Sequence, residues 1–263
     1  MRVPHPALSQ WERVLTAAVA VPIVVLITIY APDWAFALAI SLVSALAVDE
    51  FLSLTAKERS SRPGRWFLVA AAAVAMSFLG GSGWVLGTTV CAAIVLMSTA
   101  VFTGAIETAQ ERITRGLSSI VYCPLTLGFM VMMPREQILL LFAIIWSGDT
   151  AAYYGGRAFG RHRLAPKVSP KKTIEGAIAG LLGSIAAGVI GGVWFLGEPW
   201  PELIWISAAT AVTGQLGDLA ESVIKRSAGV KDSSSILPGH GGILDRLDSL
   251  FFAAPVFYWF FVS

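Results

Sequence analysis

Long apolar runs recur along almost the whole of this 263-residue sequence. A helix that spans a bilayer needs about 20 consecutive, mostly apolar residues. Only 14% of the residues are charged, against about 25% in soluble domains, so the chain lacks the polar groups to cover a water-facing surface. We therefore predict an all-α membrane protein, a polytopic bundle of about nine transmembrane helices, over residues 14–30, 34–54, 66–79, 84–106, 117–133, 138–159, 174–196, 203–224 and 243–262.

The positions of the lysines and arginines predict how the spans are oriented. All but one of the 19 fall in the N-terminal segment or in the loops that follow the second, fourth, sixth and eighth spans, and the exception is Arg135. Cytoplasmic loops collect Lys and Arg, so the N-terminus is predicted to be cytoplasmic and the C-terminus to lie on the opposite side. The short third span must accompany the fourth, because the basic loops that flank this pair belong on one side.

The two halves of the chain differ in their polar content. Residues 1–110 read as a scaffold of about four spans, in which Asp49 and Glu50 are interpreted as solvated carboxylates at the end of the second span. Residues 111–263 form the predicted catalytic region of about five spans. Its seventh span is rich in glycine at G-x-x-x-G spacings, which favours close helix packing, within the bundle or between subunits, over a ligand site.

Two later spans carry carboxylates at unusual positions. Asp149 lies near the middle of the sixth span, where a charged side chain costs about 2.5–3.5 kcal/mol, so it must face a partner, water or an ion. On the eighth span, Asp218, Glu221, Ser222 and Lys225 share one helix face. A structural hydrogen bond remains an alternative for Asp149, and a solvated ion pair of Glu221 with Lys225 remains one for those two residues, although it leaves Asp218 unexplained.

A glycine-rich segment precedes the ninth span. Gly239, Gly241 and Gly242 surround His240, and glycines allow backbone N–H groups to approach phosphate oxygens closely. The helix that follows points its N-terminal dipole at the same place, which favours anions. Its first turn carries Asp245 and Asp248 on one face. Two carboxylates beside a phosphate would repel it unless a cation such as Mg²⁺ lies between them, whereas either one alone could simply cap the helix.

A pair of lysines begins the seventh span. Lys171 and Lys172 lie in the segment from Ser169 to Gly176. Such lysines contact anionic headgroups or set orientation, and here they could also neutralise a triphosphate. Both interpretations stay open on the sequence alone.

The second half of the chain resembles a known family. The resemblance is to the phosphatidate cytidylyltransferases, also called CDP-diacylglycerol synthases, and extends over the Gly148-Asp149 element, the segment from Ser169 to Gly176 and a C-terminal signature. The signature matches without a departure in spacing at Ser222, Lys225, Arg226, Lys231, Asp232, Pro238, His240, Gly241, Gly242, Asp245, Arg246 and Asp248. The first 110 residues resemble the family only as generic spans.

The resemblance implies a reaction and its setting. CTP and phosphatidic acid would give CDP-diacylglycerol and pyrophosphate, with Mg²⁺ and possibly a second cation. The enzyme would be a homodimer among membrane lipids, with no nucleic acid partner and a site that opens to the cytoplasm. The small size without a soluble extension is typical of a bacterial plasma (inner) membrane protein.

Residue roles follow from the resemblance. Asp218, Asp245 and Asp248 would bind metal, and together with Lys225, Arg226 and Arg246 they would form the catalytic set. The substrate contacts would come from Ser222, Lys231, Asp232, His240, Gly241, Gly242, Lys171, Lys172 and Asp149. Because the phosphate of phosphatidic acid is already anionic, the reaction needs positioning and charge neutralisation rather than a strong general base.

Two other functions compete with this one. An ion-coupled membrane transporter would explain Asp149 and Asp218 but not the glycine-histidine segment with its charged neighbours. An enzyme that transfers a phospho-alcohol from a CDP-lipid would carry a different aspartate pattern, which this sequence lacks. Release of pyrophosphate from CTP only in the presence of phosphatidic acid separates all three.

Overall fold

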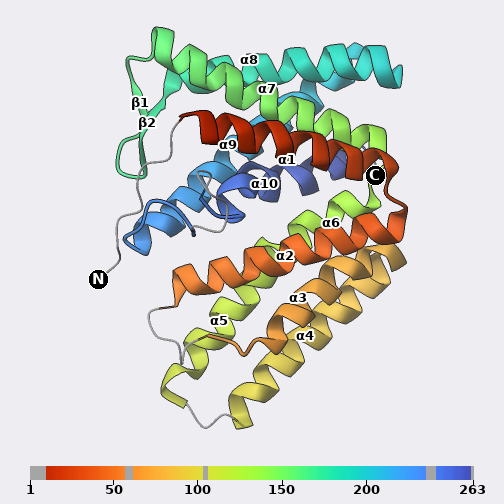
Figure 1. The fold of residues 1–263 in the computed structure, drawn as a ribbon, viewed down its shortest axis with the longest axis vertical. Coiled ribbons are helices and arrows are strands. Elements are labelled where there is room, and N and C mark those ends of the chain that lie inside the picture. The colour runs from red at the N-terminus through yellow and green to blue at the C-terminus, as the bar shows by residue number, and fades with distance from the viewer. Residues whose placement is uncertain (1–9, 57–61, 103–105, 235–240, 262–263) are drawn as a thin grey trace.

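A computed structural model of the chain describes residues 10–56, 62–102, 106–234 and 241–261. Within the described residues each predicted span falls on helix, the fifth on two successive helices, which confirms the all-α class (Figure 1). The helices are α1 (Gln10–Tyr30), α2 (Asp33–Thr55), α3 (Trp66–Met76), α4 (Ser82–Phe102), α5 (Ile106–Tyr122), α6 (Pro124–Met132), α7 (Arg135–Phe159), α8 (Ile174–Gly191), α9 (Trp200–Ser227) and α10 (Leu244–Phe261).

Many of these helices suit a bilayer by length and composition. Among the described residues, five segments qualify as membrane spans: Asp33–Thr55, Ser82–Phe102, Ile106–Met132, Arg135–Phe159 and Ile174–Leu196. Ala18–Tyr30 and Trp66–Gly80 are shorter apolar helices. Large apolar side chains such as Leu26, Trp84 and Leu86 are exposed on the outside of the bundle, as expected for a surface that meets lipid. The chain is a membrane protein, and the count of nine spans stays a prediction.

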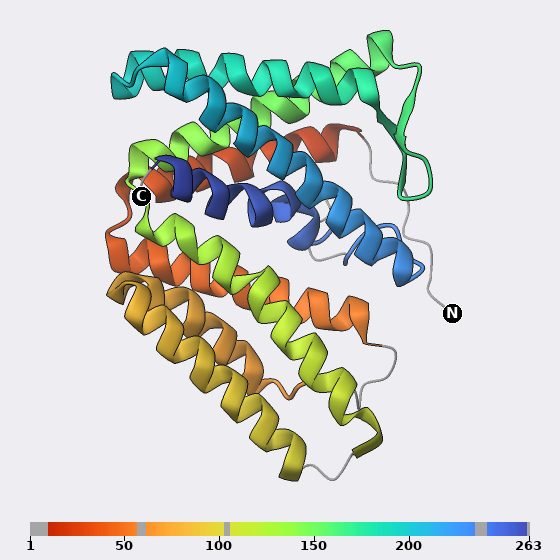
Figure 2. The same cartoon turned by 180° about the vertical axis from the view of Figure 1, so that it is seen from behind.

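The helices run alternately between two ends of the bundle. In Figure 1, α1 runs from left to right and α2 returns, and the other long helices follow the same alternation. Figure 2 shows the same arrangement from behind. The end of α2, the hairpin after α7, the end of α9 and the start of α10 therefore share one end with the start of α1. The basic segments gather there, as the predicted topology requires, while the assignment of that end to the cytoplasm remains a prediction.

Prolines start several helices at the opposite end. Pro32, Pro134 and Pro199 directly precede α2, α7 and α9. Proline fixes φ near the helical value and lacks an N–H group, so it suits a helix start and opposes continuation of the preceding helix. The short turns of the chain at this end follow from these prolines.

Small residues bring α8 unusually close to its neighbours. A Cβ atom added to Gly183 would lie 2.5 Å from Ala151 of α7, and one added to Gly148 would collide with Ser184. Ser184 Oγ also donates a hydrogen bond of 2.8 Å to the carbonyl of Ile144 on α7. The glycines of the predicted seventh span thus pack helices within the bundle, the first of the two packing alternatives.

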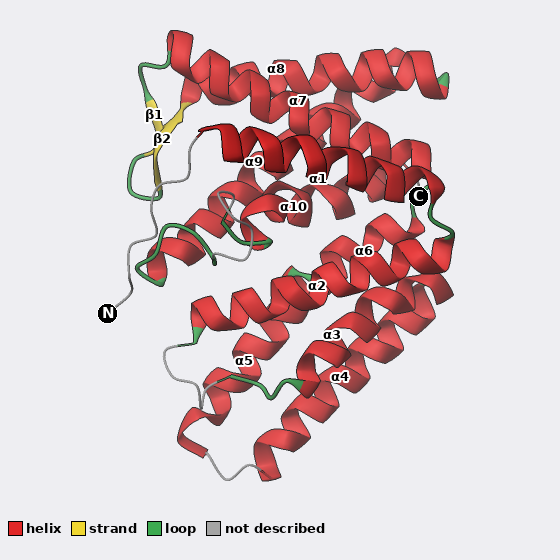
Figure 3. Ribbon diagram, viewed as in Figure 1, coloured by secondary structure: helices red, strands yellow, loops and turns green. Residues whose placement is uncertain are grey.

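A short β-hairpin, which the sequence did not predict, connects α7 to α8. Strands β1 (Arg163–Ala165) and β2 (Ser169–Thr173) pair antiparallel (Figure 3). The side chain of Thr173 accepts a hydrogen bond from the backbone N–H of Gly176 and so caps α8. Strand β2 carries Lys171 and Lys172, and its rigid attachment to α8 fixes where these two lysines lie.

Candidate active site

One large cavity collects residues from the second half of the chain and from α1. Its volume is about 920 Å³, and α1, α7, β2, α8, α9 and α10 all contribute to its walls. Seven predicted site residues line it: Asp149, Lys171, Lys172, Asp218, Asp245, Arg246 and Asp248. The tertiary structure therefore brings together residues that lie up to a hundred positions apart in the sequence.

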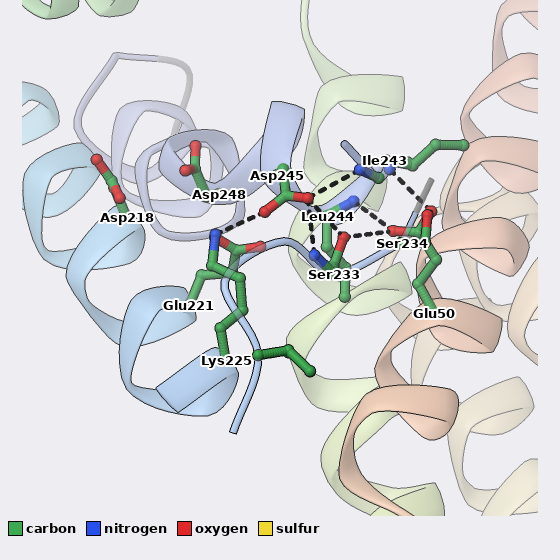
Figure 4. Close-up of polar contacts among 12 residues, drawn as sticks. Glu50, Asp218, Glu221, Lys225, Ser233, Ser234, Ile243, Leu244, Asp245 and Asp248 are labelled. Atoms are coloured by element: carbon green, nitrogen blue, oxygen red, sulfur yellow. Dashed lines mark hydrogen bonds and ion pairs between the residues drawn. The ribbon is translucent and has the colours of Figure 1, made fainter. Parts of the chain in front are cut away.

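Besides Asp245, three carboxylates from three helices line this cavity. Asp149 comes from α7, Asp218 from α9 and Asp248 from α10, and Figure 4 shows Asp218 and Asp248 side by side. Asp248 accepts a hydrogen bond of 2.7 Å from the N–H of Ser249, and Asp218 forms an ion pair with Lys172. Like charges at such a place repel one another unless cations offset them, and Lys172 supplies one positive charge.

Asp245, in contrast, is held by donors on both of its oxygens. Its Oδ1 accepts a hydrogen bond of 2.6 Å from Lys225 Nζ. Its Oδ2 accepts bonds from the backbone N–H of Gly242 (2.8 Å) and from both the N–H and the hydroxyl of Ser233 (2.9 Å each). Asp245 therefore ties Ser233 and Gly242, which precede α10, to the first turn of that helix.

Lys225 lies inside a buried charge cluster. It is only 9% exposed and pairs with Glu221, which is fully buried, as well as with Asp245. The ion pair of Glu221 with Lys225, which the sequence offered as an alternative, is present in the structure, but it is buried rather than solvated. The ammonium of Lys225 is held by both carboxylates, and its removal would leave the fully buried Glu221 without the partner that offsets its charge.

Arg226 of the predicted catalytic set lies outside the lining of the cavity, as do the predicted substrate residues Ser222, Lys231 and Asp232. Arg226 donates to the carbonyl oxygens of Val168 (3.2 Å) and Val230 (2.8 Å), and so joins the hairpin to the segment after α9. Ser222 is buried on α9, and both Lys231 and Asp232 are exposed.

The glycine-rich segment is described only in part. Gly241 has a φ of +77°, a conformation that favours glycine, and Gly242 contacts Asp245 through its N–H group. His240 lies outside the described residues.

Two of the three predicted metal ligands, Asp218 and Asp248, are placed where they could bind a divalent cation. Asp218 and Asp248 are carboxylates that share one cavity with basic residues, and oxygen ligands of this kind suit Mg²⁺. Asp245 would have to give up donors to bind a metal. Across the described ranges, no group of three His, Cys, Asp or Glu side chains is gathered as a metal site.

Glu50 is the most important residue that the sequence interpretation missed. The expectation of a solvated carboxylate is wrong, because Glu50 is only 2% exposed and bonds to the segments on both sides of residues 235–240. Its neighbour Asp49 does remain at the surface, where it pairs with Arg62 at 2.9 Å. No local pattern separates the two carboxylates, since adjacent helical residues simply point in different directions.

Polar and aromatic residues of the cavity were also missed. Gln215, Trp146 and Tyr153 line it, and Gln215 donates a hydrogen bond of 3.0 Å to the carbonyl of Ala177. Gln215 precedes Asp218 by three residues and so lies on the same helix face. An extension of the predicted polar face by one turn would have found it.

Comparison with known proteins identifies the family. The model of the "Cytidylyltransferase family" matches residues 11–263. A phosphatidate cytidylyltransferase of Synechocystis sp. is 48% identical over 126 residues, 47% of this chain and 42% of the relative. One from Haemophilus influenzae is 46% identical over 129 residues, 47% of this chain and 45% of the relative. One from Staphylococcus saprophyticus is 44% identical over 147 residues, 53% of this chain and 55% of the relative. The chain spans about half the length of the curated relatives it matches. Since the family model covers nearly the whole sequence, this chain belongs to the cytidylyltransferase family.

Proposed function

We propose that the protein is a phosphatidate cytidylyltransferase, which converts CTP and phosphatidic acid into CDP-diacylglycerol and pyrophosphate. The observation that carries the proposal is the single cavity in which carboxylates and basic side chains meet an apolar wall. The names of the matched relatives support the same activity. One cavity of mixed character suits a reaction between a water-soluble nucleotide and a lipid.

Basic side chains provide the nucleotide part of the site. Lys171, Lys172 and Arg246 line the cavity, and all lie at the end of the bundle where the basic segments gather. Ammonium and guanidinium groups neutralise phosphate oxygens, and the guanidinium does so with fixed geometry. We assign the triphosphate to this part of the cavity, with the glycine-rich segment beside it.

Apolar residues of α1 provide the lipid part. Ala20 and Val21 line the cavity beside Trp146 of α7, and neighbouring residues of α1 such as Val19 and Ile23 are exposed on the outside of the bundle. An acyl chain in the bilayer could therefore lie along α1 while its headgroup enters the polar part. Phosphatidic acid would enter sideways from the membrane, and CTP from the aqueous side.

The chemistry needs alignment more than proton transfer. An anionic phosphate oxygen of phosphatidic acid attacks the α-phosphorus of CTP, and the bond from that phosphorus to the oxygen that bridges to the β-phosphorus breaks. The new P–O–P linkage stays in CDP-diacylglycerol, and pyrophosphate leaves with the electron pair. The side chains hold two polyanions in line, since proximity alone supplies much of the rate.

We assign Mg²⁺ to Asp218 and Asp248, with Asp149 nearby in the same cavity. When bound, the ion would neutralise charge on the reacting phosphates. Lys172, which pairs with Asp218 in this structure, would then be available to a phosphate. Asp245 would hold the first turn of α10 rather than serve as a ligand.

The setting follows from the same proposal. We place the protein in a plasma membrane with the cavity open to the cytoplasm, because the basic segments gather at that end of the bundle. We also retain the homodimer as part of the proposal.

The test is pyrophosphate release by the purified full-length protein in mixed micelles. Release from CTP should require both phosphatidic acid and Mg²⁺, and it should stop when diacylglycerol, which lacks the phosphate, replaces phosphatidic acid. ATP in place of CTP should give a much lower rate. Release without any lipid, or an equal rate with either nucleotide, would overturn the assignment.

A further inference from the structure

A carboxylate from the scaffold half reaches into the site half. Glu50, in the last turns of α2, lies 193 residues before Ile243 in the sequence, yet its Oε1 accepts a hydrogen bond of 2.9 Å from the backbone N–H of Ile243. Its Oε2 accepts one of the same length from the N–H of Leu244. Helix α2 otherwise packs chiefly on α3 and α6, so this contact is a specific bridge rather than part of a broad interface.

Four donor groups lie within hydrogen-bond distance of the Glu50 carboxylate. Besides the two N–H groups, Oε1 accepts from the hydroxyl of Ser234 (2.6 Å) and Oε2 from the hydroxyl of Ser233 (3.0 Å). An ionised carboxylate offers about four acceptor sites, and each oxygen of Glu50 faces one backbone N–H group and one hydroxyl. Figure 4 shows these bonds between Glu50 and the two segments on either side of residues 235–240.

The bonds satisfy groups that a helix start leaves open. The first N–H groups of a helix have no partner within it, and α10 begins at Leu244. A negative charge at this end is also favoured by the helix dipole. Glu50 therefore caps α10 from another helix, while Asp245 in the first turn of α10 binds the residues that precede it.

The carboxylates of Glu50 and Asp245 are linked through Ser233. Its hydroxyl lies 3.0 Å from Glu50 Oε2 and 2.9 Å from Asp245 Oδ2, and its single proton serves one of them at a time. Gly242 fits between them, since a Cβ atom there would collide with Ser233 and with the Glu50 carboxylate. The first turn of α10, which carries Asp245 and Asp248, is thus held from both sides.

We propose that Glu50 is a positioning residue of the active site, which fixes the first turn of α10 and with it the carboxylate of Asp248. The expected effect of Glu50 on the rate rests on the proposed function, whereas its effect on the order of the first turn of α10 does not. Glu50 touches neither substrate nor the cavity lining, so it acts through Ser233, Ser234 and the N-terminal N–H groups of α10.

The test compares Glu50→Gln and Glu50→Ala with Asp49→Asn in the full-length protein. Glutamine keeps the shape but turns an NH₂ group toward two donors, and alanine removes every bond. Partners that orient a metal-site carboxylate are worth about 10- to 100-fold in activity or metal affinity. We expect kcat to fall by about 10-fold in Glu50→Gln and about 100-fold in Glu50→Ala, with more Mg²⁺ needed for half-maximal rate. The KM for phosphatidic acid should change less than about twofold.

Hydrogen exchange supplies a readout that is independent of activity. In protein without nucleotide, backbone amides in a peptide over residues 241–250 should exchange faster in both Glu50 variants, while peptides from α4 keep their exchange rates. Asp49→Asn should match the wild type in exchange and in kcat, because Asp49 pairs with Arg62 at the surface. If the Glu50 variants are not recovered folded, Ser234→Ala, which removes one donor, should show the same local change at smaller size.

The outcomes separate this inference from the proposed function. Unchanged exchange over residues 241–250 in both Glu50 variants and in Ser234→Ala would overturn the inference, whatever the enzyme does. Faster exchange with an unchanged kcat and Mg²⁺ requirement would overturn it as well. A wild-type protein that lacks cytidylyltransferase activity would overturn the proposed function. Faster local exchange in the variants would still support the role of Glu50 in holding the start of α10.

Discussion

The scaffold half and the site half of the bundle pack their helices by different means. Around α2, large buried side chains fill the space, as Phe36 and Phe51 of α2 and Phe67 of α3 show. Between α7 and α8, glycines such as Gly148 and Gly183 bring the backbones close instead. Lipid supplies no hydrophobic drive between helices, so the site half relies on close contact and hydrogen bonds.

The two halves also differ in their buried charges. Within the described parts of α1 to α4, Glu50 is the one charged side chain that is buried. In α9, both Glu221 and Lys225 are buried, next to the carboxylates of the cavity. Charge in a membrane protein is costly and marks function, and Glu50 fits this rule because it serves the other half.

The largest effect is expected from removal of a cavity carboxylate. Asp248→Asn should lower the rate of pyrophosphate release by about 100-fold or more, because one charge that holds the metal is lost. The exchange of amides over residues 241–250 should stay as in the wild type, since Asp248 makes none of the hydrogen bonds through which Glu50 and Asp245 hold the start of α10. Near-normal Mg²⁺-dependent activity in both Asp248→Asn and Asp218→Asn would remove the proposed metal site.

Asp245→Asn should have a smaller effect on rate and a larger one on structure. The variant disturbs the bonds to Lys225, Gly242 and Ser233, and unsatisfied buried donors cost about 1–3 kcal/mol each. We expect a rate lowered by about 10- to 100-fold together with faster amide exchange over residues 241–250. A folded variant with wild-type exchange and complete loss of activity would instead make Asp245 a metal ligand, as the sequence first suggested.

Glycine replacements should separate the two kinds of packing. Gly183→Leu inserts a side chain against Ala151 of α7 and should lower the free energy of unfolding by about 1–3 kcal/mol. Gly87→Ala in α4, where a Cβ atom meets nothing within 4 Å, should raise it by up to about 1 kcal/mol. Thermal unfolding midpoints in detergent measure both. Equal destabilisation at the two positions would contradict the contrast between the halves.

Cysteine labelling should test the sidedness with almost no effect on activity. In a background with Cys91 and Cys123 replaced by alanine, a cysteine at the exposed Arg161 should react with an impermeant reagent only from the cytoplasmic side. One at the exposed Glu198 should react only from outside. Labelling of both from the same side would contradict the alternation of helix ends that Figure 1 shows.

The sequence by itself determined the class of the protein and the position of nearly every helix. A spanning segment is a local property, because any run of about 20 apolar residues is driven into lipid and must satisfy its backbone internally. The C-terminal signature also pointed to the family that the comparison later showed. The convergence of Asp218 and Asp248 was predictable too, since both lie near the ends of spans that flank one short segment.

Only the tertiary structure decided which partner each polar residue has. Asp49 and Glu50 are adjacent carboxylates of similar hydropathy, yet Glu50 caps a distant helix whereas Asp49 pairs with Arg62. Asp245 and Asp248 share a helix face and both line the cavity, yet Ser233 and Lys225 donate hydrogen bonds only to Asp245. The burial of an apolar segment depends on how much apolar surface it has, and this can be read from its sequence. A hydrogen bond depends on the direction from donor to acceptor and on which helices are neighbours, and only the folded bundle sets these.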